Sequence, residues 1–184
     1  MQAIIEEGIQ VDAFLAPGHV SVITGTEMYE FIPEKYNRGV VVTGFEPLDV
    51  LQAVHMLVSQ QESGNAKVEI QYTRVVKEEG NVKARNIVDK IFESADANWR
   101  GLGIIPNSAL KVRDEYAIFD AERRFEINAG ESKEPAGCIC GQVLKGLKKP
   151  SQCGLFGKTC NPENPTGACM VSSEGACNVF YRYQ

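Results

Sequence analysis

Cysteine is absent from the first 137 residues of this chain, and all six cysteines lie in the last 47 residues. Histidine is also scarce, with only two in 184 residues. Because cysteine and histidine are the main protein ligands of zinc and of iron–sulfur clusters, the long first part of the chain is not expected to hold such a centre. Structural cysteines would be scattered along the core, so six clustered thiols indicate a shared ligand or redox task.

Long hydrophobic runs and basic stretches are missing as well. The longest apolar runs, such as residues 39–42, are far shorter than the ~18 residues that a membrane-spanning helix needs. The first ten residues contain two acids and no base, unlike a secretory signal. The net charge of −5 argues against nucleic acid as a partner. We therefore expect a cytoplasmic protein, with reduced thiols, that binds neither membrane nor nucleic acid.

The first 130 residues alternate between strand-like and helix-like segments. Strand-like segments occupy residues 11–16, 39–44, 68–76 and 101–105. Helical patterns occupy residues 21–31, a stretch from residue 46 onward, residues 80–96, and residues 115–125. Strands that alternate with helices predict an α/β fold with a mainly parallel sheet and flanking helices.

Two of these helices are predicted from apolar spacing. The helix that opens at Glu46 is expected to be strongly amphipathic, with Leu48, Leu51, Val54 (or His55) and Val58 at helical spacing. The helix over residues 115–125 is expected to turn Tyr116, Phe119 and Phe125 inward.

A change of composition divides the chain into two predicted domains. A polar stretch over residues 128–137 with Gly and Pro is typical of a linker or long loop. We expect an α/β domain over residues 1–130 and a cysteine-rich module over residues 131–184. Only residues 143–147 of this module look helical, and it has few large apolar side chains. It is therefore expected to need cross-links or a metal to fold.

The cysteines follow the spacing C-x-C-x12-C-x6-C-x8-C-x7-C, which contains no C-x-x-C pair. This pattern differs from zinc knuckles, thioredoxin-like sites and ferredoxins. Because iron–sulfur clusters and all-thiolate zinc sites each use four thiols, we expect a partition into four ligands and one extra pair. An iron–sulfur cluster beside a dithiol and a zinc site with two bystander cysteines both remain open, whereas three structural disulfides are not expected in the cytoplasm.

Other candidate residues carry a weaker signal. His19 follows a predicted strand, where α/β proteins often place ligands, but a structural histidine is the simpler interpretation. Glu46 and Asp49 are expected to interact with a helix dipole. Met170 and Phe156 are expected to shield the cysteine site from solvent rather than to react.

Several segments resemble one known family in the same order. They are LAPGHVS (residues 15–21), GFEPLD (44–49), YTRVV (72–76), EGN (79–81), WRGLGIIP (99–106), YAIFDA (116–121), and the six-cysteine tail. Together they resemble the C-terminal part of the HypD family, the scaffold proteins of nickel–iron hydrogenase maturation. The resemblance covers essentially the whole chain, and it implies that the predicted sheet is part of a doubly wound architecture.

The resemblance implies roles for the six cysteines. In that family the tail holds a 4Fe-4S cluster, and two further cysteines form a redox-active disulfide beside it, in an arrangement similar to ferredoxin:thioredoxin reductase. Carried over by position, the cluster ligands would be Cys138, Cys153, Cys160 and Cys177. Cys140 and Cys169 would be the redox dithiol pair. Because alternate residues of an extended strand share a face, this assignment implies a bend between Cys138 and Cys140.

The resemblance also implies partners and marks a departure. Members of the family work with a HypC-like small chaperone and a HypE-like cyanide-transfer protein. They are longer at the N-terminus, where further cysteines and histidines serve the iron that receives cyanide and carbon monoxide. We therefore expect this chain to be a shortened form or one half of a split gene, served by a separate N-terminal half. A zinc-stabilised interaction module and a free-standing thiol–disulfide reductase are the alternative hypotheses.

Overall fold

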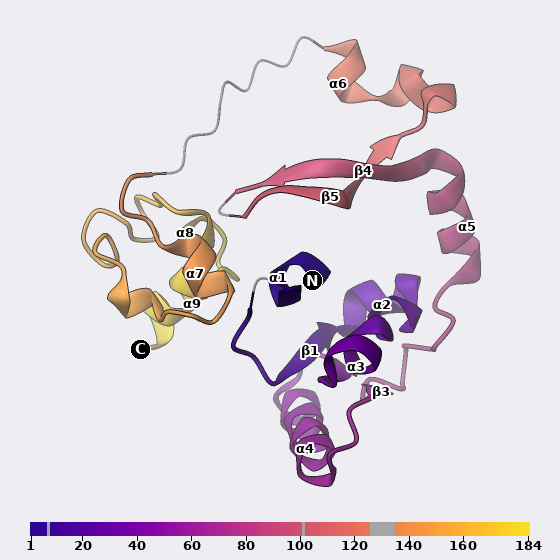
Figure 1. Cartoon of the computed structure of the whole chain (residues 1–184). Helices are drawn as coiled ribbons and strands as arrows, with labels where there is room; N and C mark the ends of the chain where they lie inside the picture. The colour runs from indigo at the N-terminus through magenta and orange to yellow at the C-terminus, as the bar shows by residue number, and fades with distance from the viewer. Residues whose placement is uncertain (7, 101, 126–134) are drawn as a thin grey trace. The chain divides into compact units, whose positions relative to one another are not determined.

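The computed structural model of the chain describes residues 1–6, 8–100, 102–125 and 135–184 (Figure 1). The described residues form two compact units. One unit is Val11–Ile91, called here the sheet unit. The other combines Met1–Gln10 with Phe92–Gln184, and its residues 135–184 are called the cysteine module. Of the predicted linker over residues 128–137, residues 128–134 lie outside the described residues.

A three-stranded parallel sheet forms the centre of the sheet unit. Its strands are β1 (Ala13–Pro17), β2 (Gly39–Thr43) and β3 (Val68–Ile70), in the order β1-β2-β3. All five residues of β2 are buried, as expected for a β-branched strand that is covered on both faces. The predicted α/β fold with a parallel sheet is confirmed. The third strand is shorter than the predicted segment 68–76, because the chain turns directly after Ile70.

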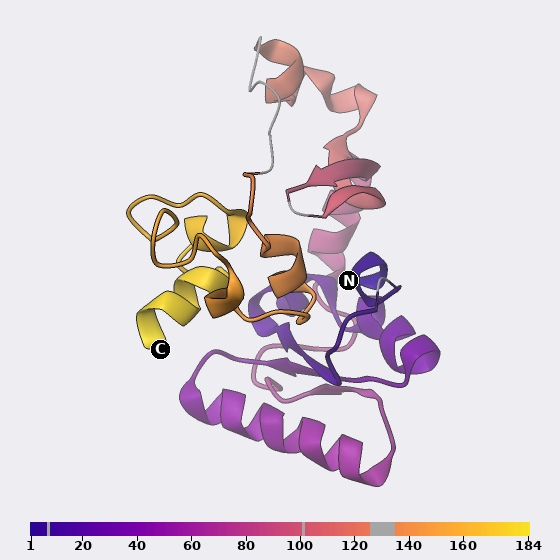
Figure 2. The ribbon, with the colours of Figure 1, turned by 60° about the vertical axis from the view of Figure 1, so that its left-hand side comes forward.

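Helices cover both faces of this sheet. They are α2 (Gly18–Thr24), the 3₁₀ helix η1 (Glu27–Tyr29), α3 (Phe31–Tyr36) and α4 (Pro47–Ser63). The last helix of the unit, α5 (Val82–Ile91), contacts α2. Helix α4 lies on one side of the strands, and α2 and α3 lie on the other (Figure 1, Figure 2). The single helix predicted over residues 21–31 is wrong. Gly25 adopts a φ of 74°, which ends α2 and lets the next amide, that of Thr26, donate to the Glu78 carbonyl at 3.0 Å.

The apolar stripe of α4 does not face the core of the sheet unit. Leu51 is 68% exposed, and Leu48, Val54 and Val58 are exposed as well. The buried residues of α4 are Asp49, Ala53 and Gln60, because polar partners on the sheet side select that face. Asp49 accepts hydrogen bonds from Gln71 and Arg74. Gln60 donates to Glu69 at 2.7 Å and accepts from the Lys67 amide.

The second unit begins with α1 (Gln2–Glu6) and continues with an antiparallel hairpin. The hairpin strands are β4 (Phe92–Trp99) and β5 (Gly103–Val112). The prediction of a helix up to residue 96 is wrong, because α5 ends at Ile91 and Phe92 already pairs with Val112 across the hairpin. The predicted apolar segment 101–105 overlaps β5 at residues 103–105; Leu102 lies in the turn before β5, and Gly101 lies outside the described residues.

The helix predicted over residues 115–125 is divided. A 3₁₀ helix, η2 (Asp114–Phe119), is followed by the short α6 (Ala121–Arg124). Between them Asp120 adopts an extended conformation and accepts a hydrogen bond from the Glu122 amide at 3.0 Å, which starts the new helix. The expectation that Phe119 and Phe125 turn inward is wrong, since both side chains are exposed, while Tyr116 is half-buried.

The cysteine module consists of short helices joined by turns. They are α7 (Cys140–Leu144), the 3₁₀ helix η3 (Pro150–Gln152), α8 (Ala168–Val171) and α9 (Ala176–Tyr183). The prediction of one helix over residues 143–147 is wrong in position, because α7 begins at Cys140 and ends at Leu144, and α8 and α9 were not predicted. Among the described helices of the chain, none combines the length and apolar character needed to cross a bilayer.

Candidate functional site

Five of the six thiols line one cavity inside the cysteine module. They belong to residues in four different stretches of the module, namely Cys138, Cys140, Cys153, Cys160 and Cys177. The rest of the lining is apolar, from Ile139, Val143, Leu155, Phe156, Gly167 and Met170. No three Cys, His, Asp or Glu side chains within the described ranges are close enough to bind a single metal ion as they stand. Five thiols therefore face one cavity, but they are not arranged around a single metal-binding point.

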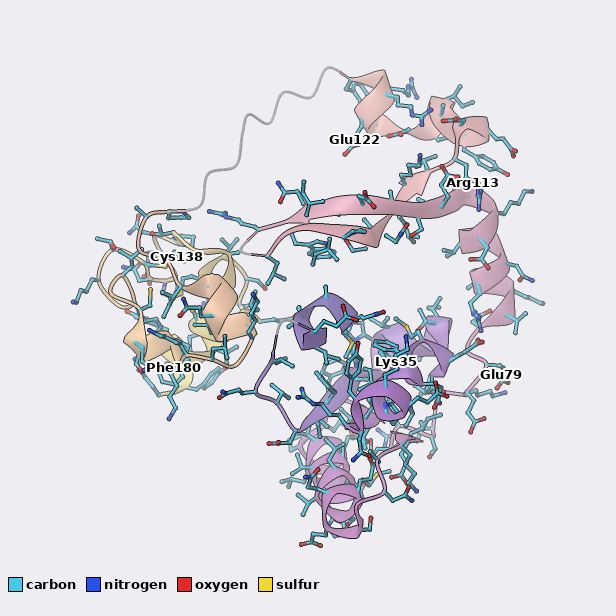
Figure 3. The ribbon with its side chains drawn as sticks, in the orientation of Figure 1. Lys35, Glu79, Arg113, Glu122, Cys138 and Phe180 are labelled. Carbon is cyan, nitrogen blue, oxygen red and sulfur yellow. The ribbon has the colours of Figure 1, made fainter. Side chains whose placement is uncertain are left out.

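A turn separates the first two thiols. Helix α7 begins at Cys140, and the residue before it, Ile139, has φ −110° and ψ 28°, which is not an extended conformation. Cys138 and Cys140 therefore do not lie on one strand face, and the expected bend between them is confirmed. Cys138 sits in the approach to α7, and its amide donates to the Pro135 carbonyl at 3.1 Å. Figure 3 labels Cys138 in the module.

Tight turns place Cys153 and Cys160. Cys153 directly follows η3, and its thiol lies 3.8 Å from the Gly137 carbonyl oxygen. Cys160 is buried and is held on both sides by the backbone, because its amide donates to the Leu155 carbonyl and its carbonyl accepts from the Gly157 amide, each at 3.0 Å. The Thr166 amide donates to Cys160 Sγ at 3.4 Å.

Helix α9 brings Cys177 to the cavity. The side-chain amide of Asn178 donates to the Met170 carbonyl at 2.9 Å, and Arg182 Nε donates to Asn178 Oδ1 at 2.6 Å, so α9 is fixed to the end of α8. Phe156 lies against Phe180 with ring centroids 5.8 Å apart. These contacts explain why Met170 and Phe156, predicted to shield the site, are part of its lining.

Cys169 differs from the other five cysteines, because it does not line the cavity and instead contacts Cys140. Its amide donates to Cys140 Sγ at 3.0 Å, and its own thiol lies 4.0 Å from the Cys140 carbonyl oxygen. Cys140 and Cys169 are 3% and 4% exposed. All six cysteines are free thiols in this structure. The two cysteines predicted as a dithiol pair are thus neighbours, in contact through backbone and sulfur.

Burial and mutual proximity raise the pKa values of three thiols in the cysteine module, those of Cys138, Cys169 and Cys177. Burial, followed by the charges of Cys140, Cys153, Cys160 and Cys138, raises the pKa of Cys177 to about 11. Burial is also the main cause of the raised pKa of Cys138. The pKa of Cys169 is raised by burial first and then by its hydrogen bond with Cys140. Without a compensating positive charge, these three groups are therefore protonated at neutral pH.

Gly167 leaves room for the sulfur of Cys138. A methyl group at this position would lie 2.6 Å from Cys138 Sγ and 3.7 Å from Cys140 Sγ. Gly167 has φ −94° and ψ 152°, a conformation open to any residue, so its backbone does not require glycine. Space for the sulfur is the reason that remains. Gly154, in the same module, has no atom within 4 Å of the corresponding position.

The family model HypD, described as "Hydrogenase formation hypA family", matches residues 1–184. The chain belongs to the HypD family. It is 48% identical over its whole length to a Methanocaldococcus jannaschii protein named for hydrogenase expression and formation, of which it covers 51%. It is 49% identical over 176 residues to the hydrogenase maturation factor HypD of Azotobacter vinelandii, covering 95% of this chain and 46% of that protein.

The HypD relative from Escherichia coli is similar to the same extent. It is 49% identical over 175 residues, which are 95% of this chain and 47% of the relative. The chain thus spans about half the length of the curated relatives that it matches, and the match lies in their C-terminal part. The resemblance inferred from the sequence is confirmed as membership of the HypD family, at the level of the whole chain.

A polar site in the sheet unit of this HypD chain, separate from the cysteine cavity, was not predicted from the sequence. At the ends of β2 and β3, the buried Asp49 accepts two hydrogen bonds from Arg74, at 2.9 and 2.8 Å, and one from Gln71 at 3.0 Å. The Arg74 guanidinium also lies over the Tyr72 ring, 4.7 Å from its centroid. Hydrogen bonds from Arg74 and Gln71 lower the pKa of Asp49. Besides the expected interaction with the helix dipole, Asp49 therefore forms an ion pair with Arg74.

The signal that could have revealed this pair is topological. Residues that follow neighbouring parallel strands meet at one edge of the sheet, and Asp49 and Arg74 follow β2 and β3. His19 lies at the same edge, in the first turn of α2 directly after β1, with its ring 5.1 Å from that of Phe45. Glu46, at the start of α4, is 3.6 Å from Arg74. The edge is thus held by an ion pair that sequence spacing alone does not show.

Proposed function

We propose that this chain supplies the part of a nickel–iron hydrogenase maturation scaffold that carries a 4Fe-4S cluster and a neighbouring dithiol. The observation that supports this most directly is the division of the six thiols. Five line one apolar cavity, and the sixth contacts Cys140. This role is that of an assembly factor with a redox centre rather than of a free-standing enzyme.

The ligands of the proposed cluster are Cys138, Cys153, Cys160 and Cys177. One observation supports this choice over other sets of four. Cys140 is the thiol that accepts a hydrogen bond from the Cys169 amide, so its sulfur is engaged with the predicted partner. The charges of Cys140, Cys153, Cys160 and Cys138 all act on Cys177, which is consistent with one shared space but does not choose among these thiols.

The donor set suits the proposed group. Iron–sulfur clusters are bound by four thiolates, and the positive charge of their iron would stabilise the ionised form of thiols whose pKa values are raised here. When bound, a 4Fe-4S cluster supplies electrons one at a time. The apolar side chains of Val143, Leu155 and Met170 would keep water from the sulfurs.

Cys140 and Cys169 would provide the two-electron step. Oxidation of their two thiols forms one S–S bond and releases two electrons and two protons, and reduction reverses this. Both residues are buried, and the Cys169 amide donates to Cys140 Sγ, so the two cysteines already lie next to each other. The proposed role of the pair is to exchange electrons in support of assembling the Fe(CN)2CO group.

The partners proposed for this activity come from family membership. They are a HypC-like small chaperone, a HypE-like cyanide-transfer protein, and the N-terminal half of a HypD protein, which would hold the iron to be modified. That iron is the cargo of the scaffold rather than a resident metal of this chain. The activity of the whole scaffold is therefore proposed to need these partners in addition to this chain.

Anaerobic reconstitution tests the proposed centre. The purified chain is supplied with iron and sulfide, and its iron, sulfide and zinc contents are measured with its visible spectrum. We expect about four irons and four sulfides per chain and a brown protein. Serine replacement of Cys138, Cys153, Cys160 or Cys177 should lower the iron content, whereas Cys140→Ser and Cys169→Ser should retain it. A colourless protein that binds one zinc would falsify the proposal.

A further inference from the structure

Residues 92–125, called here the hairpin segment, are folded without a core. Of the described residues 92–100 and 102–125, none is buried. The segment comprises β4, β5, η2 and α6, and its sheet has two strands only. A two-stranded hairpin without further packing is at best marginally stable in water. Its regular secondary structure therefore requires another surface to cover it.

The hairpin has one polar and one apolar face near its base. Glu93 and Lys111 lie opposite each other and form a salt bridge of 2.9 Å, which Arg113 extends to Glu93. Because side chains alternate along a strand, the neighbouring pair Phe92 and Val112 projects from the other face. Figure 3 shows the side chains of β4 and β5 on both sides of the ribbon and labels Arg113 at the end of β5.

Leu110 lies on this apolar face, since it is two residues from Val112, and it is 60% exposed. Further along the segment, Ile104 is 73% exposed and Phe119 is 74% exposed. Ile118 and Phe125 are exposed as well. The apolar face that Leu110 shares with Phe92 and Val112 marks a surface for another polypeptide.

The charges of the hairpin segment are largely neutralised within it. Besides the pairs of Glu93, Arg123 contacts Asp114 at 2.7 Å and Asp120 at 3.3 Å. A segment whose bases are paired with its own acids offers little to a polyanion. The partner of this surface is therefore a protein with an apolar face.

We propose that the hairpin segment is the docking surface for the half of a HypD protein that lies outside the matched region. The relatives are about twice as long as this chain, and the match covers 46–51% of them in the cases described above. A polypeptide of comparable size thus exists in the family to cover the exposed face. This inference rests on family membership and on exposure, and it does not depend on the cluster.

Co-expression tests the proposal with two matched variants. The tagged 184-residue chain is produced together with the remaining, N-terminal part of the Methanocaldococcus jannaschii relative as a separate chain, and complex formation and affinity are measured. Leu110→Gln and Lys111→Gln introduce the same side chain at adjacent positions on opposite faces. Because both residues are exposed, neither replacement disturbs a core in the free chain.

We expect a one-to-one complex that Leu110→Gln weakens by about tenfold or more, while Lys111→Gln changes affinity by less than about threefold. Amide hydrogen exchange over residues 92–112 should slow on complex formation. Absence of a complex, equal affinities of the two variants, or unchanged exchange over this segment would each overturn the proposal. Self-association of the chain through the hairpin segment, without the second polypeptide, would overturn it in favour of a homodimer.

Discussion

In the sheet unit, the centre is a strand of aliphatic side chains, with Val40, Val41 and Val42 fully buried between helices. In the cysteine module, sulfur dominates the buried set, with Cys140, Cys160, Cys169 and Met170, and few aliphatic side chains accompany it. An aliphatic core stabilises the fold under any redox condition. A core of thiols can change with oxidation or with a bound metal, so we expect the stability of the module to depend on its ligand.

The largest effect is expected from a charge in the aliphatic core. Val41 is 0% exposed, so Val41→Asp would bury an unpaired carboxylate and should destabilise the sheet unit by about 4 kcal/mol or more. Urea denaturation followed by circular dichroism measures this loss, and Val58→Asp on the exposed face of α4 is the control. If the two regions differ as described, reconstituted iron should survive Val41→Asp. Loss of iron in parallel with the sheet would show that the two regions depend on each other.

The next effect concerns the space around a single sulfur. Gly167→Ala places a methyl group against Cys138 Sγ, so we expect it to lower the iron retained after reconstitution and to alter the rate at which Cys138 is alkylated in the metal-free chain. Gly154→Ala adds the same methyl group in open space and should behave as the wild type. If wild-type protein binds the cluster and both variants retain it equally, Gly167 has no role in positioning the ligand.

An intermediate effect is expected from the ion pair at the sheet edge. The pKa of Asp49 is lowered in the folded chain, chiefly by Arg74, so the unfolded state binds the proton more readily. The resulting stabilisation is present above the ordinary aspartate pKa of about 4 and is lost as the pH falls through the lower, folded value. Asp49→Asn should remove this part of the acid dependence. Unfolding measured between neutral and acidic pH checks it, and parallel curves for both proteins would contradict it.

The parallel sheet and the gathering of thiols at one site were predictable, because both follow from local pattern. The β-branched run at residues 39–44 predicts a buried strand, and the clustering of six cysteines after residue 137 is visible in the sequence alone. The hairpin of residues 92–112 was not predictable in the same way, since Phe92 continues the helical spacing of α5 and its strand pairing with Val112 is a tertiary preference. The Asp49–Arg74 pair joins residues 25 positions apart, which no local pattern records.

The smallest effect is expected where apolar spacing predicted the wrong face. If the stripe of α4 packed against the sheet, Leu51→Ser would cost ~2–5 kcal/mol, as large-to-small core replacements do. Because Leu51 is 68% exposed, we expect a change within ~0.5 kcal/mol in the free chain. Ile32→Ala provides the contrast, since Ile32 is 0% exposed and its replacement should cost the full core amount. Urea unfolding of both variants decides between the two faces: equal losses would mean that the stripe of α4 is covered in solution, whereas a loss confined to Ile32→Ala is expected if polar partners of Asp49 and Gln60 orient this helix.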